Sequence, residues 1–367
     1  MSSIQQNIEN LRDELHLHNY NYYVLDKPVI SDFEFDMKLK DLINLENQYP
    51  EFNDNNSPSI RIGGSIIKNF NTIVHDFPMY SLDNSYSKDD LEQWNDRVFK
   101  NIGDENLKYL CELKFDGVSI NLTYENGKLI KAVTRGDGVK GDDVTENIKT
   151  IKTIPLKLKG SYPANFQIRG EIIIEKHDFL KMNKKRVEKG LEPYMNPRNT
   201  ASGSLKLQDS SETAKRPLKC FLYQIVSSEQ NYKTQNDYLV EALDWGFNIS
   251  KTYKLCNNLS QVMSYINYWD EERDNLNYEI DGIVVKVNDI NYQKELGFTS
   301  KYPRWSIAYK YKTEQALTKL LSVSYQIGRT GAATPVANLE PVLLGGTYVK
   351  RASLHNEDQI NKFDLHI

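Results

Sequence analysis

The sequence predicts an α+β protein built in three parts. A small helical part is expected at residues 1–70, antiparallel sheets flanked by helices at 71–315, and the start of a small β-barrel at 316–367. Three observations support this prediction. Apolar residues recur at helical spacing near the N-terminus, short strands joined by hairpins alternate with helices in the middle, and strands separated by Gly and Pro turns fill the last part. Hairpin-joined strands flanked by helices indicate antiparallel sheets.

Two amphipathic helices are expected in the N-terminal part. The first follows from apolar residues at helical spacing, namely Ile4, Ile8, Leu11 and Leu15. The second begins at a capping-box pattern, Ser31 with Glu34, and continues with Phe35, Leu39, Leu42 and Leu45. The stretch 49–64 is rich in Pro, Asn, Ser and Gly and is interpreted as a linker, which places the first boundary near residue 70.

The middle part shows strand patterns and two helical patterns. Strands are expected at 109–112, 119–124, 129–134, 166–174 and 282–287, and helices at 236–245 and 259–273. The turn Glu125-Asn126-Gly127-Lys128 joins two of these strands into a hairpin. Strands at 320–329, 337–343 and 346–352 would suit the start of a barrel.

Composition and charge exclude several classes of protein. With 39% hydrophobic and 26% charged residues the chain has a soluble, globular composition, and no apolar run approaches the ~20 residues of a membrane helix. The polar, acidic N-terminus is no signal peptide, so the cytoplasm is expected. The three cysteines form no CxxC pair and the six histidines no ligand motif, so no metal site is predicted. Because the net charge is −4, any binding to DNA would need local basic patches.

The most informative stretch is the Lys-x-Asp-Gly motif at 114–117. In a strand, Lys114 and Asp116 point to the same side, which places a carboxylate near the amine. A desolvated lysine near other cations can present the neutral amine that attacks phosphorus. By itself, this four-residue pattern is more often a surface hairpin than a site.

Four further segments change that balance because each places a charged side chain on or next to a predicted strand. They are Thr134-Arg135-Gly136-Asp137-Gly138, Arg169-Gly170-Glu171-Ile172, Glu279 to Lys286 with Asp281, and Trp305 to Lys312 with Lys310. A structural role could explain one charged side chain on a strand, but it does not explain several of them together. Cations that converge on a phosphate stabilise charge at a reacting phosphoryl group.

In this order the motifs resemble those of the nucleotidyltransferase superfamily of polynucleotide ligases and capping enzymes. In detail the chain resembles the bacterial NAD-dependent DNA ligases over essentially its whole length. The matching strings are SLDNSY (81–86), CELKFDGVS (111–119), TRGDGVKGDDVTENIKTI (134–151), NPRNTASGSLK (196–206), EIDGIVVKV (279–287) and GRTGAATPVANLEPVLLGGTYVKRASLHN (328–356).

The resemblance implies a role for each residue of the adenylation site. Lys114 forms the lysyl-AMP phosphoramidate, with Glu112 beside the adenine and Glu171 near the ribose. Lys286 and Lys310 contact the AMP phosphate and favour the neutral amine. Asp116, Asp281 and Arg135 complete the pocket, together with Ser81 and Leu82 of the SLDNSY string.

The N-terminal helices decide between NAD and ATP as the AMP donor. The residues alone leave open whether an aromatic helical hairpin is a core or a binding face. The resemblance implies that Tyr22, Asp32 and Asp36 bind the nicotinamide mononucleotide (NMN) half of NAD, with Tyr23 and Phe35 beside them. Tyr23 stands where many relatives have histidine and Phe35 where many have tyrosine. Both exchanges keep an aromatic face, so changed affinity is expected rather than a changed cosubstrate.

DNA contacts are expected at Arg198, at Lys206, where the family often has arginine, and at Arg329 and Thr330 in the barrel part. Mg²⁺ is expected at the phosphates without a dedicated protein cage. The resemblance therefore implies an NAD-dependent DNA ligase that seals nicked double-stranded DNA, expected as a monomer. Because the barrel stops early and the family's further regions are missing, the chain is expected to be a fragment. It should form lysyl-AMP but seal nicks weakly or not at all.

The motifs also bear on three other functions. An ATP- or GTP-using nucleotidyltransferase would not need Tyr22, Asp32 and Asp36. A non-catalytic nucleic-acid-binding module would never form a covalent adduct. The pattern Gly136-x-Gly138-x-x-Gly141 resembles a dinucleotide-binding loop, but it follows the second arm of a hairpin rather than opening a parallel strand–helix–strand unit. Hydride chemistry is therefore rejected.

Overall fold

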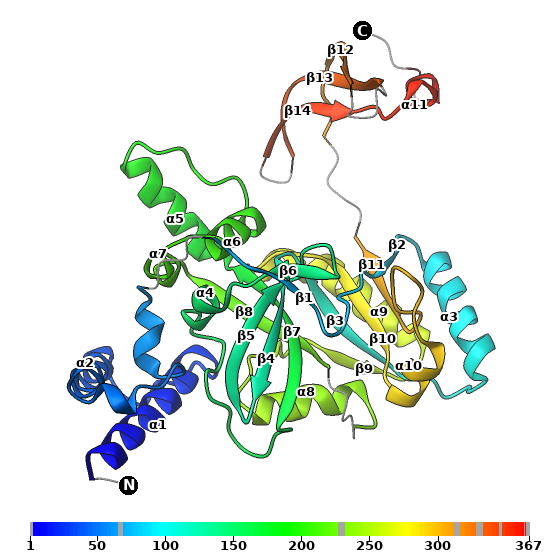
Figure 1. The fold of residues 1–367 in the computed structure, drawn as a ribbon. Coiled ribbons are helices and arrows are strands. Elements are labelled where there is room, and N and C mark those ends of the chain that lie inside the picture. The colour runs from blue at the N-terminus through cyan, green and yellow to red at the C-terminus, as the bar shows by residue number, and fades with distance from the viewer. Residues whose placement is uncertain are drawn as a thin grey trace. The chain divides into compact units, whose positions relative to one another are not determined.

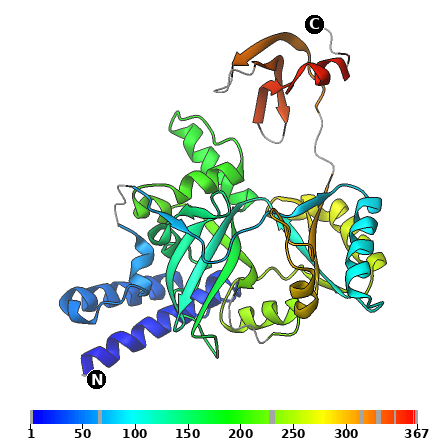
Figure 2. The same ribbon diagram turned by 45° about the vertical axis from the view of Figure 1, so that its right-hand side comes forward.

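The computed structural model describes residues 3–64, 69–226, 232–311, 316–327, 333–344, 347–362 and 364. The chain divides into two units, the larger formed by Met1–Glu192 with Pro197–Tyr311 and the smaller by Pro193–Asn196 with Lys312–Ile367. Figures 1 and 2 show the larger unit as N-terminal helices next to two sheets with helices packed around them.

Two helices form the N-terminal part, as predicted. They are α1 (Ser3–Tyr23) and α2 (Asp32–Gln48). The capping box at the start of α2 is confirmed, because the Glu34 amide donates to the Ser31 hydroxyl over 3.2 Å and the Ser31 amide donates to the Glu34 carboxylate over 2.8 Å. Ile8, Leu15 and Leu42 are fully buried between the two helices. Apolar spacing therefore predicted both the helices and the face on which they meet.

The stretch 49–64, interpreted as a linker, is an ordered connection. The segment contains two short 3₁₀ helices, Pro50–Phe52 and Pro58–Ile62. The buried Arg61 guanidinium donates to the backbone carbonyls of Ile151 and Ile154, both over 2.7 Å. Pro and Ser initiate these helices, so a composition typical of loops here encodes an ordered connection packed on the next part.

Two sheets form the core of the larger unit. The five-stranded sheet has the order β2-β11-β10-β3-β9 and the four-stranded sheet the order β5-β4-β7-β8. In the first lie β2 (Asp83–Ser85), β11 (Ser306–Lys310), β10 (Ile280–Val287), β3 (Tyr109–Phe115) and β9 (Lys254–Cys256). In the second lie β5 (Lys128–Thr134), β4 (Val118–Glu125), β7 (Asn165–Ile174) and β8 (Leu218–Val226). β1 (Thr72–Val74) and β6 (Lys140–Asp142) pair separately.

The strand pairs are antiparallel as predicted, except that β2 and β11 run parallel. The predicted hairpin of β4 and β5 is present. Asn126 and Gly127 at its tip both have positive φ, which is the conformation of the tight turns that match strand twist. A local Asn-Gly signal was enough to predict this turn.

Helices cover the sheets and complete two hydrophobic cores, one beneath each sheet. The helices are α3 (Lys88–Ile102), α4 (Thr145–Lys149), α5 (Lys176–Glu188), α6 (Pro197–Leu205), α7 (Ser210–Ala214), α8 (Gln235–Asp244), α9 (Leu259–Glu272) and α10 (Ile290–Leu296). Of these, α8 and α9 match the two helices that the sequence predicted.

The smaller unit contains an antiparallel three-stranded sheet in the order β12-β13-β14. Its elements are β12 (Leu320–Ile327), β13 (Ala333–Leu344), β14 (Thr347–Ser353) and α11 (Glu357–Lys362). Within the described residues these strands form an open sheet and do not close a barrel. None of the described helices is both long and apolar enough to span a membrane.

Candidate active site

A cavity of about 370 Å³ lies where the two sheets meet. Strands from both sheets contribute to its walls. The predicted site residues that line it are Ser81, Leu82, Glu112, Lys114, Arg135, Glu171, Arg198, Asp281, Lys286 and Lys310. Segments far apart in the sequence therefore converge on one space, as the motif set required.

Lys114 lies near the end of β3, opposite Gly282 of β10, and Gly282 in turn lies opposite Lys310 of β11. Both lysine side chains approach Asp281. The Lys114 ammonium is 2.8 and 2.9 Å from the two Asp281 oxygens, and the Lys310 ammonium is 3.5 Å from one of them. The carboxylate thus holds both ammonium groups at the same level of the sheet.

Gly282 allows this close approach. A Cβ atom at Gly282 would lie 2.1 Å from the Tyr309 carbonyl oxygen, which is far inside van der Waals contact. Since that oxygen is backbone, it cannot move aside without breaking the pairing of β10 with β11. The glycine of the Asp-Gly dipeptide at 281–282 is therefore required by strand spacing.

Glu112 and Lys286 form a buried ion pair at the base of the cavity. The Lys286 ammonium lies 2.8 and 2.9 Å from the Glu112 oxygens and also donates to the Tyr223 carbonyl over 3.0 Å. The side chains are 6% and 9% exposed. Burial raises the pKa of Glu112, and the Lys286 charge opposes that shift. The expected phosphate contact of Lys286 therefore has a competitor, because here its ammonium is held by Glu112.

Glu171 on β7 lies opposite Ser119 of β4, and the Ser119 hydroxyl donates to its carboxylate over 2.7 Å. Burial raises the Glu171 pKa to about 7, although Ser119, Lys114 and Arg198 all act to lower it. Desolvation outweighs these partners because the carboxyl lies between the two sheets. This group therefore titrates near neutral pH.

Stability should depend on pH through this carboxyl. The folded chain binds the Glu171 proton more tightly than the unfolded chain, so its contribution is fully present below pH 4.5 and is lost as the pH rises through about 7. Relative to Glu171→Gln, the wild type should lose on the order of 2 kcal/mol of unfolding free energy between pH 5 and pH 8. Urea unfolding at both pH values measures this difference. The exposed Glu188→Gln is the control, and equal pH profiles for wild type and Glu171→Gln would disprove the assignment.

The remaining predicted residues around Lys114 are held by ion pairs and hydrogen bonds. Arg198 on α6 contacts Asp116 over 2.6 Å, and Arg135 donates to the Ser81 hydroxyl over 2.8 Å. Lys206 pairs with Asp142 over 2.7 Å. Arg198 and Lys206 line a groove of about 280 Å³ that shares Arg135 and Glu171 with the cavity. Arg329 and Thr330 lie outside the described residues.

The predicted nicotinamide residues gather in a second cavity, of about 580 Å³. Tyr22, Tyr23, Asp32, Phe35 and Asp36 all line it. The two tyrosine rings are 4.6 Å apart. The two cavities share no lining residue, so the structure groups these five side chains without bringing them to Lys114.

Basic residues that the sequence did not single out complete this second cavity. Lys152, Arg61 and Lys215 line it, and Lys152 donates to the Tyr23 hydroxyl over 2.8 Å. Arg61 and Lys152 approach from segments that sequence spacing does not connect with Tyr23. No local signal could have identified them.

Aromatic side chains of the first cavity were also missed. Tyr223 of β8 lies 5.5 Å below the Lys286 ammonium, and the exposed rings of Tyr80 and Phe298 stack 4.8 Å apart at its rim. Arg169 was quoted within a motif but was given no role. It lines the cavity and donates to the carbonyls of Phe77 and Pro78.

The carboxylates around Lys114 do not form a metal cage. Asp281 is paired with two lysines and Asp116 with Arg198. In the described ranges, the group of His, Cys, Asp and Glu that could hold an ion is Glu175, His177 and Asp178, none of which lines this cavity. The residues at Lys114 therefore do not fit a protein-held Mg²⁺.

The sequence was compared with known protein families. A family model described as the NAD-dependent DNA ligase adenylation domain matches residues 67–314. The chain belongs to the NAD-dependent DNA ligase family. A model for the DNA ligase-like, N-terminal NAD⁺-binding domain matches residues 1–63, and one for the NAD-dependent DNA ligase OB-fold domain matches 317–367. The predicted family, the α+β fold class and the expected OB-fold region are thereby confirmed.

Members of the family with high identity are named DNA ligase. One from Flavobacterium johnsoniae is 60% identical over 365 residues, and one from Flavobacterium psychrophilum is 59% identical over 365 residues. A third, from Bacteroides fragilis, is 53% identical over 368 residues. Each match covers 100% of this chain but 55% of the relative, so the chain spans about half the length of the curated relatives it matches.

Proposed function

We propose that this chain carries out the AMP-accepting step of NAD-dependent DNA ligation, with Lys114 as the nucleophile. The observation that carries the proposal is the placement of Lys114, Asp281 and Lys310 at one level of the sheet inside the cavity. An amine, a carboxylate within hydrogen-bond distance of it and a second cation are the groups that a nucleophilic attack on phosphorus needs.

In the proposed step, the Lys114 Nζ attacks the adenylyl phosphorus of NAD. An N–P bond forms while the P–O bond to the NMN phosphate breaks, and NMN leaves with the electron pair. Asp281 already contacts Nζ through both oxygens and is placed to receive its proton. Lys310 offsets the charge that develops on the phosphoryl oxygens.

We assign the base-binding end of the cavity to Glu112 and Lys286. In the strand register Lys286 lies opposite Leu110, four strand positions from Lys114, whereas Lys310 lies at its level. The Tyr223 ring next to this pair offers an aromatic face for the adenine. Glu171 and Ser119 would face the ribose. Mg²⁺, if required, would be held by phosphate oxygens, and no step is assigned to it.

The later steps would transfer AMP to the 5′-phosphate of a DNA nick, after which the 3′-hydroxyl displaces it. Arg198 and Lys206 support this proposal because they line the groove that continues from the Lys114 cavity. Arg198 also pairs with Asp116, which couples the expected phosphate contact to the Lys-x-Asp-Gly motif. Arg329 and Thr330 stay predicted DNA contacts.

NAD rather than ATP as the AMP donor is supported by the second cavity. Replacing Asp32 and Asp36 by alanine should slow lysyl-AMP formation from NAD by roughly tenfold or more, since a lost hydrogen bond to a charged group weakens binding by about 1.5–3 kcal/mol. Intact mass followed over time, with NAD or ATP as donor, measures this rate.

Asp41→Ala is the matched control because Asp41 is also an exposed acid on α2 but does not line the cavity. An unchanged rate in the double variant, together with an adduct from ATP, would move the chain to the ATP-using branch of the superfamily. No adduct from either nucleotide would leave the non-catalytic binding module as the better description.

A further inference from the structure

Helix α5 is strongly basic; it packs on one core through the partly buried Phe179 and Met182, and none of its described side chains is fully buried. Residues 176–189 carry six lysine or arginine side chains and two acids, a local excess of four positive charges in a chain whose net charge is −4. These two apolar side chains lie at i and i+3 on one side of the helix, whereas Lys184, Lys185 and Lys189 are exposed and take no part in that contact. Its cations therefore need an explanation other than packing.

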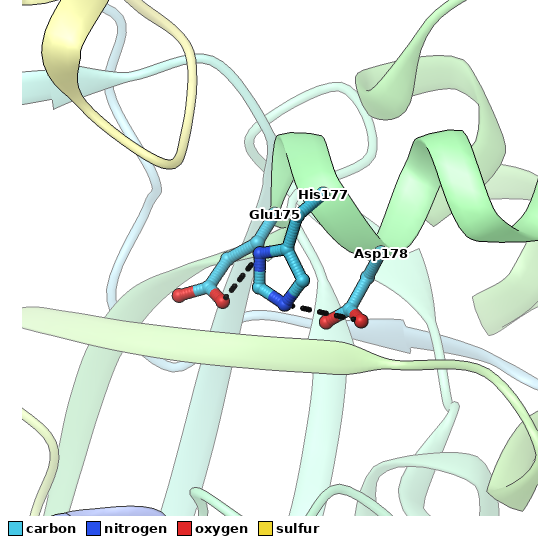
Figure 3. Close-up of side chains that lie close together, drawn as sticks. All are labelled: Glu175, His177 and Asp178. Carbon is cyan, nitrogen blue, oxygen red and sulfur yellow. Dashed lines mark ion pairs between the residues drawn. The ribbon is translucent and has the colours of Figure 1, made fainter.

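The first turn of α5 is fixed by a cluster of charged side chains, drawn in Figure 3. His177 Nδ1 lies 3.6 Å from Glu175 and His177 Nε2 lies 3.2 Å from Asp178, while Lys219 pairs with Glu175 over 2.8 Å. The histidine ring stands between the two carboxylates, and each of its nitrogens faces one of them. This cluster anchors the helix and carries no metal proposal.

Beyond that turn, three lysines of the helix and its C-terminal end have no ion pair with a carboxylate among the described residues. Lys184, Lys185 and Lys189 are exposed, and among the described residues no carboxylate lies within 4.0 Å of their ammonium groups. Lys181 is 3.8 Å from Asp178. Like charges four residues apart, such as Lys181 with Lys185 and Lys185 with Lys189, destabilise a helix by about 0.2–0.5 kcal/mol per pair. Asp178 and Glu188 offset part of this repulsion, but an excess of four positive charges remains on residues 176–189.

The position of α5 indicates which ligand would neutralise the positive charge of the helix. In Figures 1 and 2 α5 projects from the body of the larger unit next to α6. Helix α6 carries Arg198, which lines both the Lys114 cavity and the neighbouring groove. A polyanion that reached Lys114 along this groove would have α5 at its side.

We propose that Lys184, Lys185 and Lys189 bind the phosphate backbone of duplex DNA flanking the nick. The inference rests on the proposed function and extends it to a surface outside the adenylation site. Lysine ammonium groups on an exposed helix contact phosphates without reading bases, so this surface adds affinity and orientation but no sequence preference. It is one local basic patch through which a chain of net charge −4 can bind DNA.

The test is the binding of a fluorescent nicked duplex to the full chain, measured by anisotropy from 0.05 to 0.3 M salt. The variant is Lys184→Gln, Lys185→Gln, Lys189→Gln. Each phosphate contact contributes about 0.9 to the slope of log Kd against log salt, so the slope should fall by about 2 to 3 and affinity by roughly tenfold or more. The control replaces Lys100, Lys108 and Lys294 by glutamine, which removes the same charge from exposed positions near α3 and α10.

Lysyl-AMP formation from NAD is measured on the same samples, because it reports folding and the proposed function independently of DNA. A weaker, less salt-dependent complex with normal adduct formation, absent in the control variant, would support the proposal. An unchanged salt slope in the α5 variant would overturn it, as would a wild-type chain that forms lysyl-AMP but does not bind the duplex. Loss of the adduct in the wild type would instead refute the proposed function.

Discussion

Replacing Lys114 by alanine should abolish the mass gain of one AMP that we expect for the wild-type chain after incubation with NAD and Mg²⁺. The other two lysines that line the cavity are placed differently: Lys310 lies farther from Asp281, at 3.5 Å, and Lys286 is held by Glu112. The expected adduct level is therefore below detection rather than merely reduced. Intact mass spectrometry after reaction is the measurement.

The fold should tolerate this change. Lys114 is 23% exposed, and Asp281 keeps Lys310 at 3.5 Å when Lys114 is lost. A partly exposed ion pair contributes about 0–1 kcal/mol, so the melting temperature should change little. Lys114→Arg is the matched variant, because it keeps the charge near Asp281 but has no amine nucleophile, and it should also give no adduct. An adduct on either variant would show that another residue is the nucleophile.

Replacing Lys286 by alanine should destabilise the larger unit strongly. The substitution leaves the Glu112 carboxylate buried without its cation, and breaking a buried pair in this way costs about 3–5 kcal/mol. For a unit of this size the melting temperature should fall on the order of 10 °C. Thermal unfolding followed by circular dichroism measures the effect.

The pH dependence of this loss of stability shows whether the unpaired Glu112 carboxylate causes it. Burial already raises the pKa of Glu112 in the wild type, and loss of the Lys286 charge raises it further. A protonated Glu112 needs no cation, so the destabilisation should be smaller at pH 5 than at pH 8. The double variant Glu112→Gln, Lys286→Met removes both charges and should recover most of the stability at pH 8. Equal losses at both pH values would mean that Lys286 acts through packing of its aliphatic chain instead.

Local signals predicted the parts of the fold that depend on neighbouring residues. The capping box at Ser31 and the Asn126-Gly127 turn each act within a few positions, and the structure contains both. Helix α5 was not predicted, because its sequence carries no comparable local signal. Its contact with the core comes from the partly buried Phe179 and Met182, and two such positions give too short an apolar pattern to predict a helix.

The site was predicted as a set of residues but not as a geometry. Strand alternation placed Lys114, Lys286 and Lys310 on strands, and all three line the cavity. Which of them lie at one level depends on the register of β3, β10 and β11, which is set by contacts between distant segments. The pairing of Lys286 with Glu112 spans 174 positions in the sequence, and no spacing rule could give it.

The same long-range pairing has a consequence for how the protein comes to be folded. Lys114 and its partner Asp281 are 167 positions apart, and the strand that carries Lys114 pairs with β10 along nearly its whole length. The chain loses the entropy of closing this large loop before the contacts between the strands stabilise it. Sheets of this topology therefore form slowly. During synthesis on the ribosome, β3 emerges long before β10 and β11. Until β10 is made, this apolar strand has no partner on that side. Capacity to accept AMP should therefore arise late and all at once, when the residues after 280 have left the exit tunnel.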